Sequence, residues 1–186
     1  MASISTTSAF LDTQTWNTQA VDIVKIANSR NGNLLLKSKQ NNQLLAIKTP
    51  PFVTTYGIDD FNGRDTTSKI KIRIDEMNTP ECQDFIIKID DFEKFVKNEI
   101  VKKSLLQKMS YTPMINEKQM ICIDCHKDII IRNSAGDVLF PNKQEISLKQ
   151  LVTRNSTISC IIKMSYIYSN AGKWGVKMHI IEVTIL

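Results

Sequence analysis

The sequence predicts a mainly β domain with one inserted helix, folded as a small antiparallel barrel. Three observations support this prediction. Stretches that alternate between apolar and polar residues lie on both sides of one stretch with apolar residues at three- and four-residue spacing. Turn-forming residues such as Asn31-Gly32 separate the alternating stretches. The 186 residues, 42% of them hydrophobic, suffice for one domain with a buried core.

The composition excludes several classes of protein. The net charge of +5 permits an anionic partner such as a nucleic acid but does not identify one. No apolar run approaches the roughly 18 residues of a membrane helix, so no membrane association is expected. The sequence holds no P-loop, zinc-protease or serine-hydrolase motif. We therefore expect neither an enzyme nor a bound cofactor.

The domain is expected to span residues 20–186. Residues 1–19 are rich in Ser and Thr, lack periodicity and are typical of a flexible tail. The first strands are expected at residues 21–26, 34–36 and 44–47. Pro50 ends the third strand because proline cannot donate to a β-ladder. Residues 69–74 alternate strictly, so three isoleucines should face the core, and the other face should carry Lys69, Lys71 and Arg73.

One segment, at about residues 79–109, is predicted to be a helical insertion. Thr79 can cap the helix and Pro80 suits the first helical position. An apolar stripe at three- and four-residue spacing follows, with Phe85, Ile89, Phe92 and Val96 as its centre. The helix should run on, or restart, towards Met109.

The remainder is again predicted to be mostly β. Strands are expected at residues 120–123, 129–132, 138–140, 157–168 and 173–185. Ser147 is expected to cap a single helical turn that reaches Leu151. Five or six antiparallel strands with an inserted helix indicate a barrel of the OB type, and a β-sandwich is the alternative.

The charge is segregated along the chain. Residues 75–100 hold eight acidic residues against three lysines, a net charge of −5. Residues 20–73 carry a net +5, and residues 102–132 and 137–186 each carry +3. Solvated helix faces and strand edges would explain this pattern. A basic groove on the β part, with the acidic helix away from it, would explain it equally well.

Aromatic residues interleave with lysines in the last two strands. Trp174 follows a turn, between Lys173 and Gly175, and suits either a base-stacking platform or a plug for the barrel. Tyr166 and Tyr168 lie two residues apart and should project to one side of their strand. That side also carries Met164, so it could equally be the core face.

The cysteines and histidines contain one cluster with chemical potential. Cys122, Cys125 and His126 have the C-x-x-C-H spacing of covalent haem attachment. With Cys160 or His179 they could also supply four zinc ligands. We favour a third interpretation, in which residues 119–125 form a strand with small buried thiols, as is common in proteins.

Three patches of sequence then resemble a known family. The first runs from Val152-Thr153-Arg154-Asn155-Ser156 through Tyr166-Ile167-Tyr168 and Gly172-Lys173-Trp174-Gly175 to Val183. The second is Ile47-Lys48-Thr49-Pro50, followed by Phe52 and Tyr56-Gly57, and the third is Ser110-Tyr111-Thr112-Pro113. Taken in chain order, the three patches resemble the single-stranded-DNA-binding proteins of large eukaryotic DNA viruses and, more distantly, those of phage replication systems.

The resemblance implies an OB-fold that binds single-stranded DNA without regard to sequence, in viral genome replication, recombination or repair. It places the protein at viral replication sites in the host cytoplasm or nucleus, or in the virion. Replication or recombination proteins, RNA and a second copy of the chain are further partners to expect. The predicted binding residues are Lys48, Lys69, Lys71, Arg73, Arg154, Lys163, Tyr166, Tyr168, Lys173, Trp174 and Lys177.

Two other classes stay open at this point. A virion structural or scaffold protein would use the strands and the acidic helix for assembly and would not bind nucleic acid. A metal or haem protein would use Cys122, Cys125 and His126. The histidines, only two in number, have no recognisable catalytic neighbours.

Overall fold

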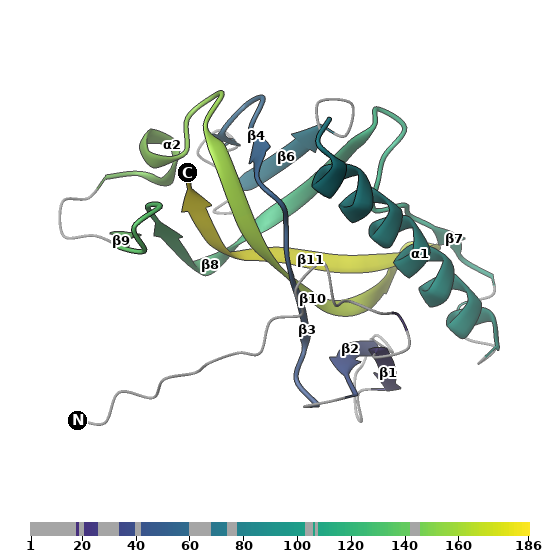
Figure 1. The fold of residues 1–186 in the computed structure, drawn as a ribbon. Helices are drawn as coiled ribbons and strands as arrows, with labels where there is room; N and C mark the ends of the chain where they lie inside the picture. The colour runs from purple at the N-terminus through teal and green to yellow at the C-terminus, as the bar shows by residue number, and fades with distance from the viewer. Residues whose placement is uncertain are drawn as a thin grey trace, which may run out of the picture.

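The computed structural model describes residues 18, 21–25, 34–39, 42–59, 68–73, 78–102, 106, 108–141 and 146–186. Its main strands are β1 (Val21–Lys25), β2 (Leu34–Ser38), β5 (Ile58–Asp59), β6 (Lys69–Arg73), β8 (Met120–Arg132), β10 (Thr157–Asn170) and β11 (Lys173–Ile185). They form one sheet in the order β1-β2-β10-β11-β8-β6-β5 (Figure 1). Shorter strands attach beside this path: β3 (Leu45–Lys48) and β4 (Phe52–Val53) on β10, β7 (Ser110–Tyr111) on β11, and β9 (Val138–Phe140) on β8.

The prediction of a mainly β domain with one long inserted helix is confirmed. All described strands belong to one connected sheet, so the alternative of a two-sheet sandwich is wrong. The pairing is mixed rather than purely antiparallel, because β11 runs parallel to both β7 and β8. After β9 the chain returns, so that β10 runs opposite to β8. Because β11 is antiparallel to β10, β11 runs parallel to β8.

The first hairpin agrees with the sequence as far as it is described. β1 and β2 pair antiparallel, with Val21 opposite Ser38 and Lys25 opposite Leu34. The predicted turn at Asn31-Gly32 lies outside the described residues, as do residues 1–19 apart from residue 18.

The strand β8 corrects one prediction. Two strands were expected, at residues 120–123 and 129–132, but β8 is continuous from Met120 to Arg132. Cys125 pairs with Ile180 of β11, and the next pair joins Ile130 to Glu182, so residues 126–129 bulge opposite a single residue. The polar residues of this bulge interrupt the alternation in the sequence without ending the strand.

The inserted helix α1 (Pro80–Lys102) begins as predicted. The Thr79 hydroxyl oxygen accepts a hydrogen bond from the backbone N–H of Cys82 at 3.3 Å, as an N-cap should. The helix ends at Lys102, before the expected limit, and residues 108–109 form a turn. The short helix α2 (Leu148–Leu151) starts at the predicted Ser147 cap. In the described part of the chain, neither helix is long and apolar enough to cross a membrane.

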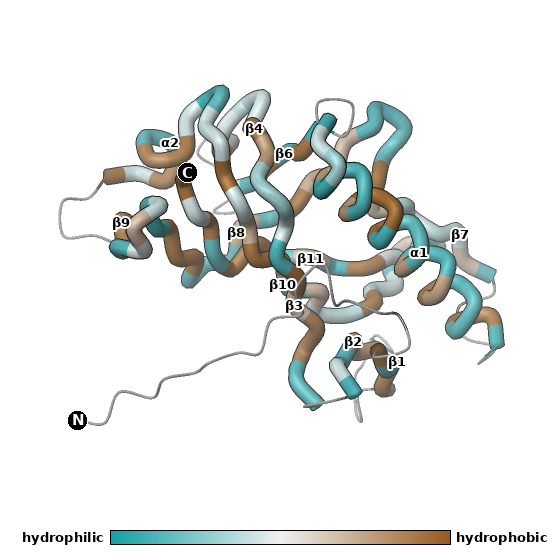
Figure 2. The backbone as a smooth tube through the Cα atoms, in the orientation of Figure 1, coloured by the Kyte–Doolittle hydropathy of each residue, from teal (hydrophilic) through white to brown (hydrophobic). Residues whose placement is uncertain are grey.

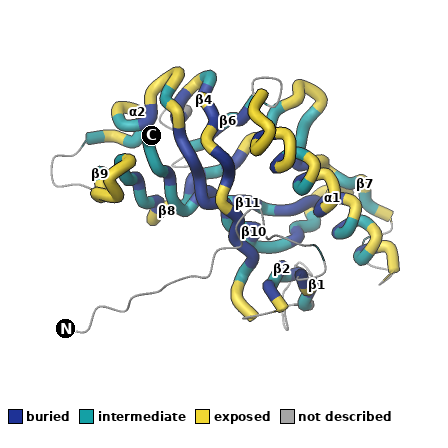
Figure 3. The backbone as a smooth tube through the Cα atoms, viewed as in Figure 1, coloured by how far each residue is buried: buried dark blue, intermediate teal, exposed yellow. Residues whose placement is uncertain are grey.

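The core lies between the sheet and α1. The apolar stripe of α1 is buried from Phe85 to Ile100, while the opposite side of the helix is polar and exposed (Figures 2 and 3). This stripe joins the same hydrophobic cluster as alternate residues of the strands, such as Ile70, Ile123 and Ile180. The sheet therefore has one face against α1 and the core, and an opposite face that is free of the helix.

Candidate nucleic-acid interface

The sheet face that points away from the core is polar. Register places Lys69 of β6 opposite Asp124 of β8, Asp124 opposite His179 of β11, and His179 opposite Lys163 of β10. Directly paired residues point to the same face, so these four side chains form one row across four strands. By the same alternation this surface, called the polar face below, also carries Lys71, Arg73, Cys122, Lys177, Tyr166 and Tyr168.

The tyrosines reach the polar face because β10 contains a β-bulge. Met164 and Tyr166 pair with consecutive residues of β11, so Ser165 is an extra residue in β10. The extra residue reverses the alternation, and Tyr166 and Tyr168 lie on the side of Lys177 while Met164 is fully buried. The alternative that placed both tyrosines with Met164 on the core face is therefore wrong.

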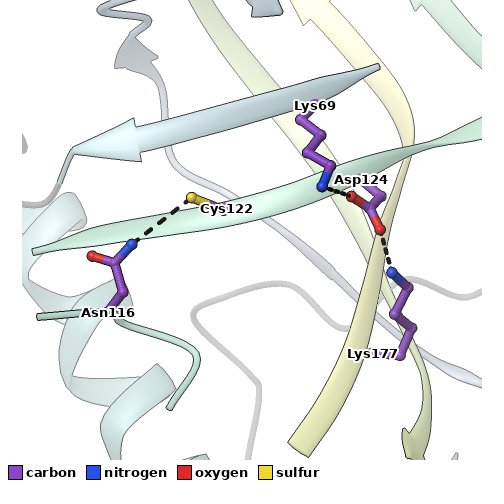
Figure 4. A network of polar contacts seen from close by, with 5 residues as sticks. All are labelled: Lys69, Asn116, Cys122, Asp124 and Lys177. Atoms are coloured by element: carbon purple, nitrogen blue, oxygen red, sulfur yellow. Dashed lines mark hydrogen bonds and ion pairs between the residues drawn. The ribbon is translucent and has the colours of Figure 1, made fainter. Parts of the chain in front are cut away.

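An ion network joins three strands of the polar face (Figure 4). The Lys69 ammonium lies 3.4 Å from one carboxylate oxygen of Asp124, and the Lys177 ammonium donates a hydrogen bond to the other. Burial raises the pKa of the Asp124 carboxyl, but the hydrogen bonds and charges of Lys177 and then Lys69 outweigh burial and hold this pKa below its ordinary value. Two lysines thus share one carboxylate, and the network keeps a net positive charge.

Gly175 leaves room for the side chain of Tyr168. A Cβ atom at Gly175 would lie 2.9 Å from the Tyr168 hydroxyl oxygen and 3.1 Å from the Thr112 carbonyl oxygen. The first distance is shorter than real Cβ atoms show and the second is tight, so a side chain at residue 175 would have to displace the phenol end of Tyr168. Gly175, the glycine that follows Trp174 in the sequence patch, therefore makes room for Tyr168 on the neighbouring strand.

Trp174 requires a correction. Only 5% of this residue is exposed, and its ring centroid lies 4.6 Å from that of Tyr111. The side chain of Trp174 points to the face opposite that of its strand neighbours Lys173 and Gly175, which is the core side of β11. A buried indole cannot stack a base, so the interpretation of Trp174 as a stacking platform is wrong for this structure, and the core plug is right.

The other predicted basic residues are spread around the polar face. Lys173 is exposed at the tip of the β10–β11 hairpin, and Lys48 is exposed on β3 opposite Ile161. The Lys71 ammonium lies 5.8 Å from the ring centroid of Tyr56. Arg73 lies opposite Met120 at the far end of β6. Arg154 is not brought to this cluster, because it lies in the turn before β10, at the other end of that strand from the tyrosines.

The Cys122, Cys125 and His126 cluster is not brought together. Cys122 is exposed on the polar face, whereas Cys125, three residues along the same strand, is buried in the core. A haem or zinc site needs both thiols on one side. The described residues contain no group of three potential metal ligands. The favoured interpretation is confirmed for the strand and for the buried Cys125 thiol, but it is wrong for Cys122, whose side of the strand faces outward.

Sequence reasoning missed several residues of this region. Asp124, His179 and Asn116 were not predicted as site residues, yet all three lie at the polar face or beside it. His179 was detectable, since it follows Lys177 at a spacing of two on an alternating strand. The role of Asp124 depends on the pairing of β8 with β6 and β11, which no local pattern shows.

A pocket of about 320 Å³ opens beside the polar face. Its walls come from β6, β8, β10, β11 and residues 112–116, and they include Lys69, Asp124, Tyr168 and Lys177. The buried carboxylate of Glu93 on α1 fixes the segment 112–116, because it accepts hydrogen bonds from the Tyr111 hydroxyl at 2.8 Å and from the Met114 N–H. The helix therefore supports the pocket from the core side.

The exposed acidic side chains of α1 stay apart from the polar face, and only the buried Glu93 approaches the pocket. Asp84 pairs with Lys88 at 2.8 Å, and Asp90 pairs with Lys94 at 2.6 Å, both along the outer side of the helix. The apolar stripe of α1 packs on the core side of the sheet. The segregation of charge in the sequence therefore corresponds to a segregation in space.

Comparison with known proteins shows similarity of fold alone. No protein-family model matches the chain, and no curated protein matches its sequence. A single-stranded DNA-binding protein from bacteriophage Enc34 in complex with ssDNA matches with a TM-score of 0.52 and 12% identity, over 89% of this chain and 95% of that chain. Another structure of the Enc34 protein gives 0.51 and 13%, over 88% and 89%. The T7 protein gp2.5, a single-stranded DNA binding protein, gives 0.50 and 10%, over 77% and 86%.

These matches bear on the sequence resemblance. They are bacteriophage proteins, so the more distant of the two resemblances is supported at the level of the fold. The closer resemblance, to proteins of large eukaryotic DNA viruses, stays a prediction.

Proposed function

We propose that this protein binds single-stranded DNA without regard to sequence, and that it acts by binding rather than by catalysis. The observation that carries the proposal is the polar face, where lysines from three strands and two tyrosines lie on one surface. Lysines neutralise phosphates, and tyrosine rings stack bases of any identity. The fold shared with single-stranded DNA-binding proteins of bacteriophages Enc34 and T7 supports the proposal.

The arrangement of charge favours this function over a scaffold protein. In the described part of the chain no ion pair involves Lys48, Lys163 or Lys173, so these ammonium groups can meet phosphates without losing a carboxylate partner. Asp84, Asp90 and Asp91 of α1 pair with lysines of the same helix. These residues lie on the exposed side of α1, whose apolar stripe packs into the core. A strand that follows β10 and β11 would therefore meet positive charge without repulsion from α1.

The biological setting is the finer part of the proposal. We infer a role in replication of a viral genome, at replication sites in the host. Recombination and repair are related processes that also pass through single-stranded DNA. RNA and replication proteins stay predicted partners, because contacts to phosphates and stacked bases do not by themselves distinguish DNA from RNA.

A salt-dependent titration tests the proposal. Labelled dT oligomers of several lengths, with a duplex as control, are titrated with the protein and followed by fluorescence anisotropy. Single strands should bind more tightly than the duplex, and log affinity should fall with log salt by about 0.7 for each phosphate neutralised. Equal affinity for duplex and single strand, or no binding at low salt, would contradict the proposal.

A further inference from the structure

The pocket beside the polar face has the size of a site for a single small ligand. Its volume of about 320 Å³ lies at the lower end of the range for small-ligand pockets, roughly 300–1,000 Å³. Such a space suits one nucleotide and not several. Lys69, Tyr168 and Lys177 belong both to the pocket and to the polar face, so a strand bound along the face passes the mouth of the pocket.

One wall of the pocket presents hydrogen-bond donors. The Asn116 side-chain oxygen accepts hydrogen bonds from the N–H groups of Lys118 at 2.9 Å and Met120 at 3.1 Å. This fixes the orientation of the amide and leaves its NH₂ group 3.9 Å from the Cys122 sulfur (Figure 4). The ammonium groups of the two lysines add further donors. These groups suit the carbonyl and phosphate oxygens of a nucleotide.

The other wall is apolar. Its apolar lining residues are Pro113, Met114, Met120, Val176 and Met178. Methionine side chains are flexible and polarisable and make favourable contacts with aromatic rings. These apolar side chains suit the ring of a base, while the partly exposed side chains of Lys69 and Lys177 suit a charged phosphate.

Asp124 occupies the position that a phosphate would take. Its carboxylate lies between the ammonium groups of Lys69 and Lys177 and forms an ion pair with each, and only 16% of its side chain is exposed. A phosphate at the same two lysines would lie close to this negative charge. The carboxylate must therefore oppose phosphate binding while it holds the lysines in place.

We propose that this pocket takes one nucleotide of the bound strand, with the base against the methionines and the phosphate on Lys69 and Lys177, and that Asp124 competes with the phosphate for these lysines. The inference rests on the proposed binding of single-stranded DNA. It adds a defined subsite and a residue that weakens binding, and neither is needed for the proposed function itself.

Methyl NMR of the wild-type protein tests the subsite. Protein labelled at methionine methyl groups is titrated with dTMP, with thymidine and with inorganic phosphate. The resonances of Met120 and Met178 should shift with dTMP, through the ring current of the base, and Met164 should not, because it lies in the core outside the pocket. Equal shifts with phosphate alone, or shifts confined to methionines outside the pocket, would overturn the inference.

Two variants test the roles of the residues. Asp124→Asn should bind dTMP and dT oligomers more tightly, by roughly fivefold, the effect of one unit charge at about 4 Å in a water-like dielectric. Asp128→Asn is the matched control, since Asp128 is exposed in the β8 bulge and does not line the pocket. Cys122→Phe should fill the pocket and abolish the dTMP shifts, whereas Cys122→Ser should preserve them.

The outcomes separate this inference from the proposed function. Binding of dT oligomers without any dTMP shift, or with unchanged or weaker binding by Asp124→Asn, would overturn the inference and leave single-strand binding intact. Absence of dT oligomer binding at low salt would contradict both.

Discussion

The two faces of the β10–β11 hairpin differ in chemistry although both are formed by the same two strands. Successive residues of each strand point to opposite faces. On β11, Trp174, Val176, Met178 and Ile180 are buried, while the residues between them include Lys173, Gly175, Lys177 and His179. On β10 the same division holds only after the bulge at Ser165 is taken into account. One face therefore contributes mainly stability, with Val176 and Met178 also lining the pocket, and the other is available for a bound strand. Substitutions on the two faces should affect different measurements.

The largest effect is expected on the core face. Trp174→Ala should lower the free energy of unfolding by about 3–5 kcal/mol, because it empties a buried aromatic site beside Tyr111. Urea denaturation followed by circular dichroism measures this loss. A variant with unchanged stability and lost DNA affinity would restore Trp174 to the binding surface and break the distinction between the faces.

The next effect belongs to the polar face. Tyr168→Ala should weaken the binding of dT oligomers by about 1–3 kcal/mol, the contribution of one base stacked on an aromatic ring. Tyr168→Phe keeps the ring and serves as the control. Affinities are compared under conditions where urea curves show each variant to be folded. Equal loss in both variants would mean that the hydroxyl group, and not stacking, is responsible.

A smaller effect is expected from a single lysine. Lys163→Gln removes a positive charge from the row that joins Lys69 to β10, and the slope of log affinity against log salt should become shallower by about 0.7 if one phosphate contact is lost. Lys94→Gln, on the outer side of α1, is the matched control and should leave the slope unchanged. An identical change in both variants would indicate that only the total charge matters.

The smallest effect concerns pH. Burial and then the charge of Lys177 lower the pKa of His179 below its ordinary 6.5, so the folded state takes up its proton less readily than the unfolded state. The contribution of His179 to stability is complete above the unfolded pKa and declines as pH falls from about 6.5 towards the folded pKa. The stability difference between wild type and His179→Gln should therefore shrink or reverse between about pH 7.5 and pH 5.5. A constant difference over that range would show that His179 has the same pKa in both states.

The sequence predicted the elements that depend on local patterns. The alternation of residues 69–73, the Thr79 cap and apolar stripe of α1, and the last hairpin all follow from periodicity and turn residues, and the structure confirms them. Aromatic residues between lysines also pointed to β10 and β11, where the structure places two tyrosines and Lys177 on the polar face.

The sequence did not predict features that depend on the pairing of distant strands. The bulge at Ser165 changes which face the tyrosines occupy, and nothing in the local pattern marks it. The polar residues of the β8 bulge looked like the end of a strand, and the position of Trp174 beside a turn fitted a stacking platform as well as a plug. Asp124 contacts Lys69 and Lys177 only because β8 lies between β6 and β11. Such contacts require the register of the whole sheet.

The central claim, that the polar face binds the strand, is tested most directly by mapping where single-stranded DNA touches the protein. Ultraviolet crosslinking to a dT oligomer, followed by mass spectrometry of the peptides, locates the contacts on the wild-type chain. Crosslinks at Tyr166 and Tyr168 of β10, with none on α1, are the predicted result. Crosslinks concentrated on α1, or their absence from β10 when the oligomer is bound, would contradict the account.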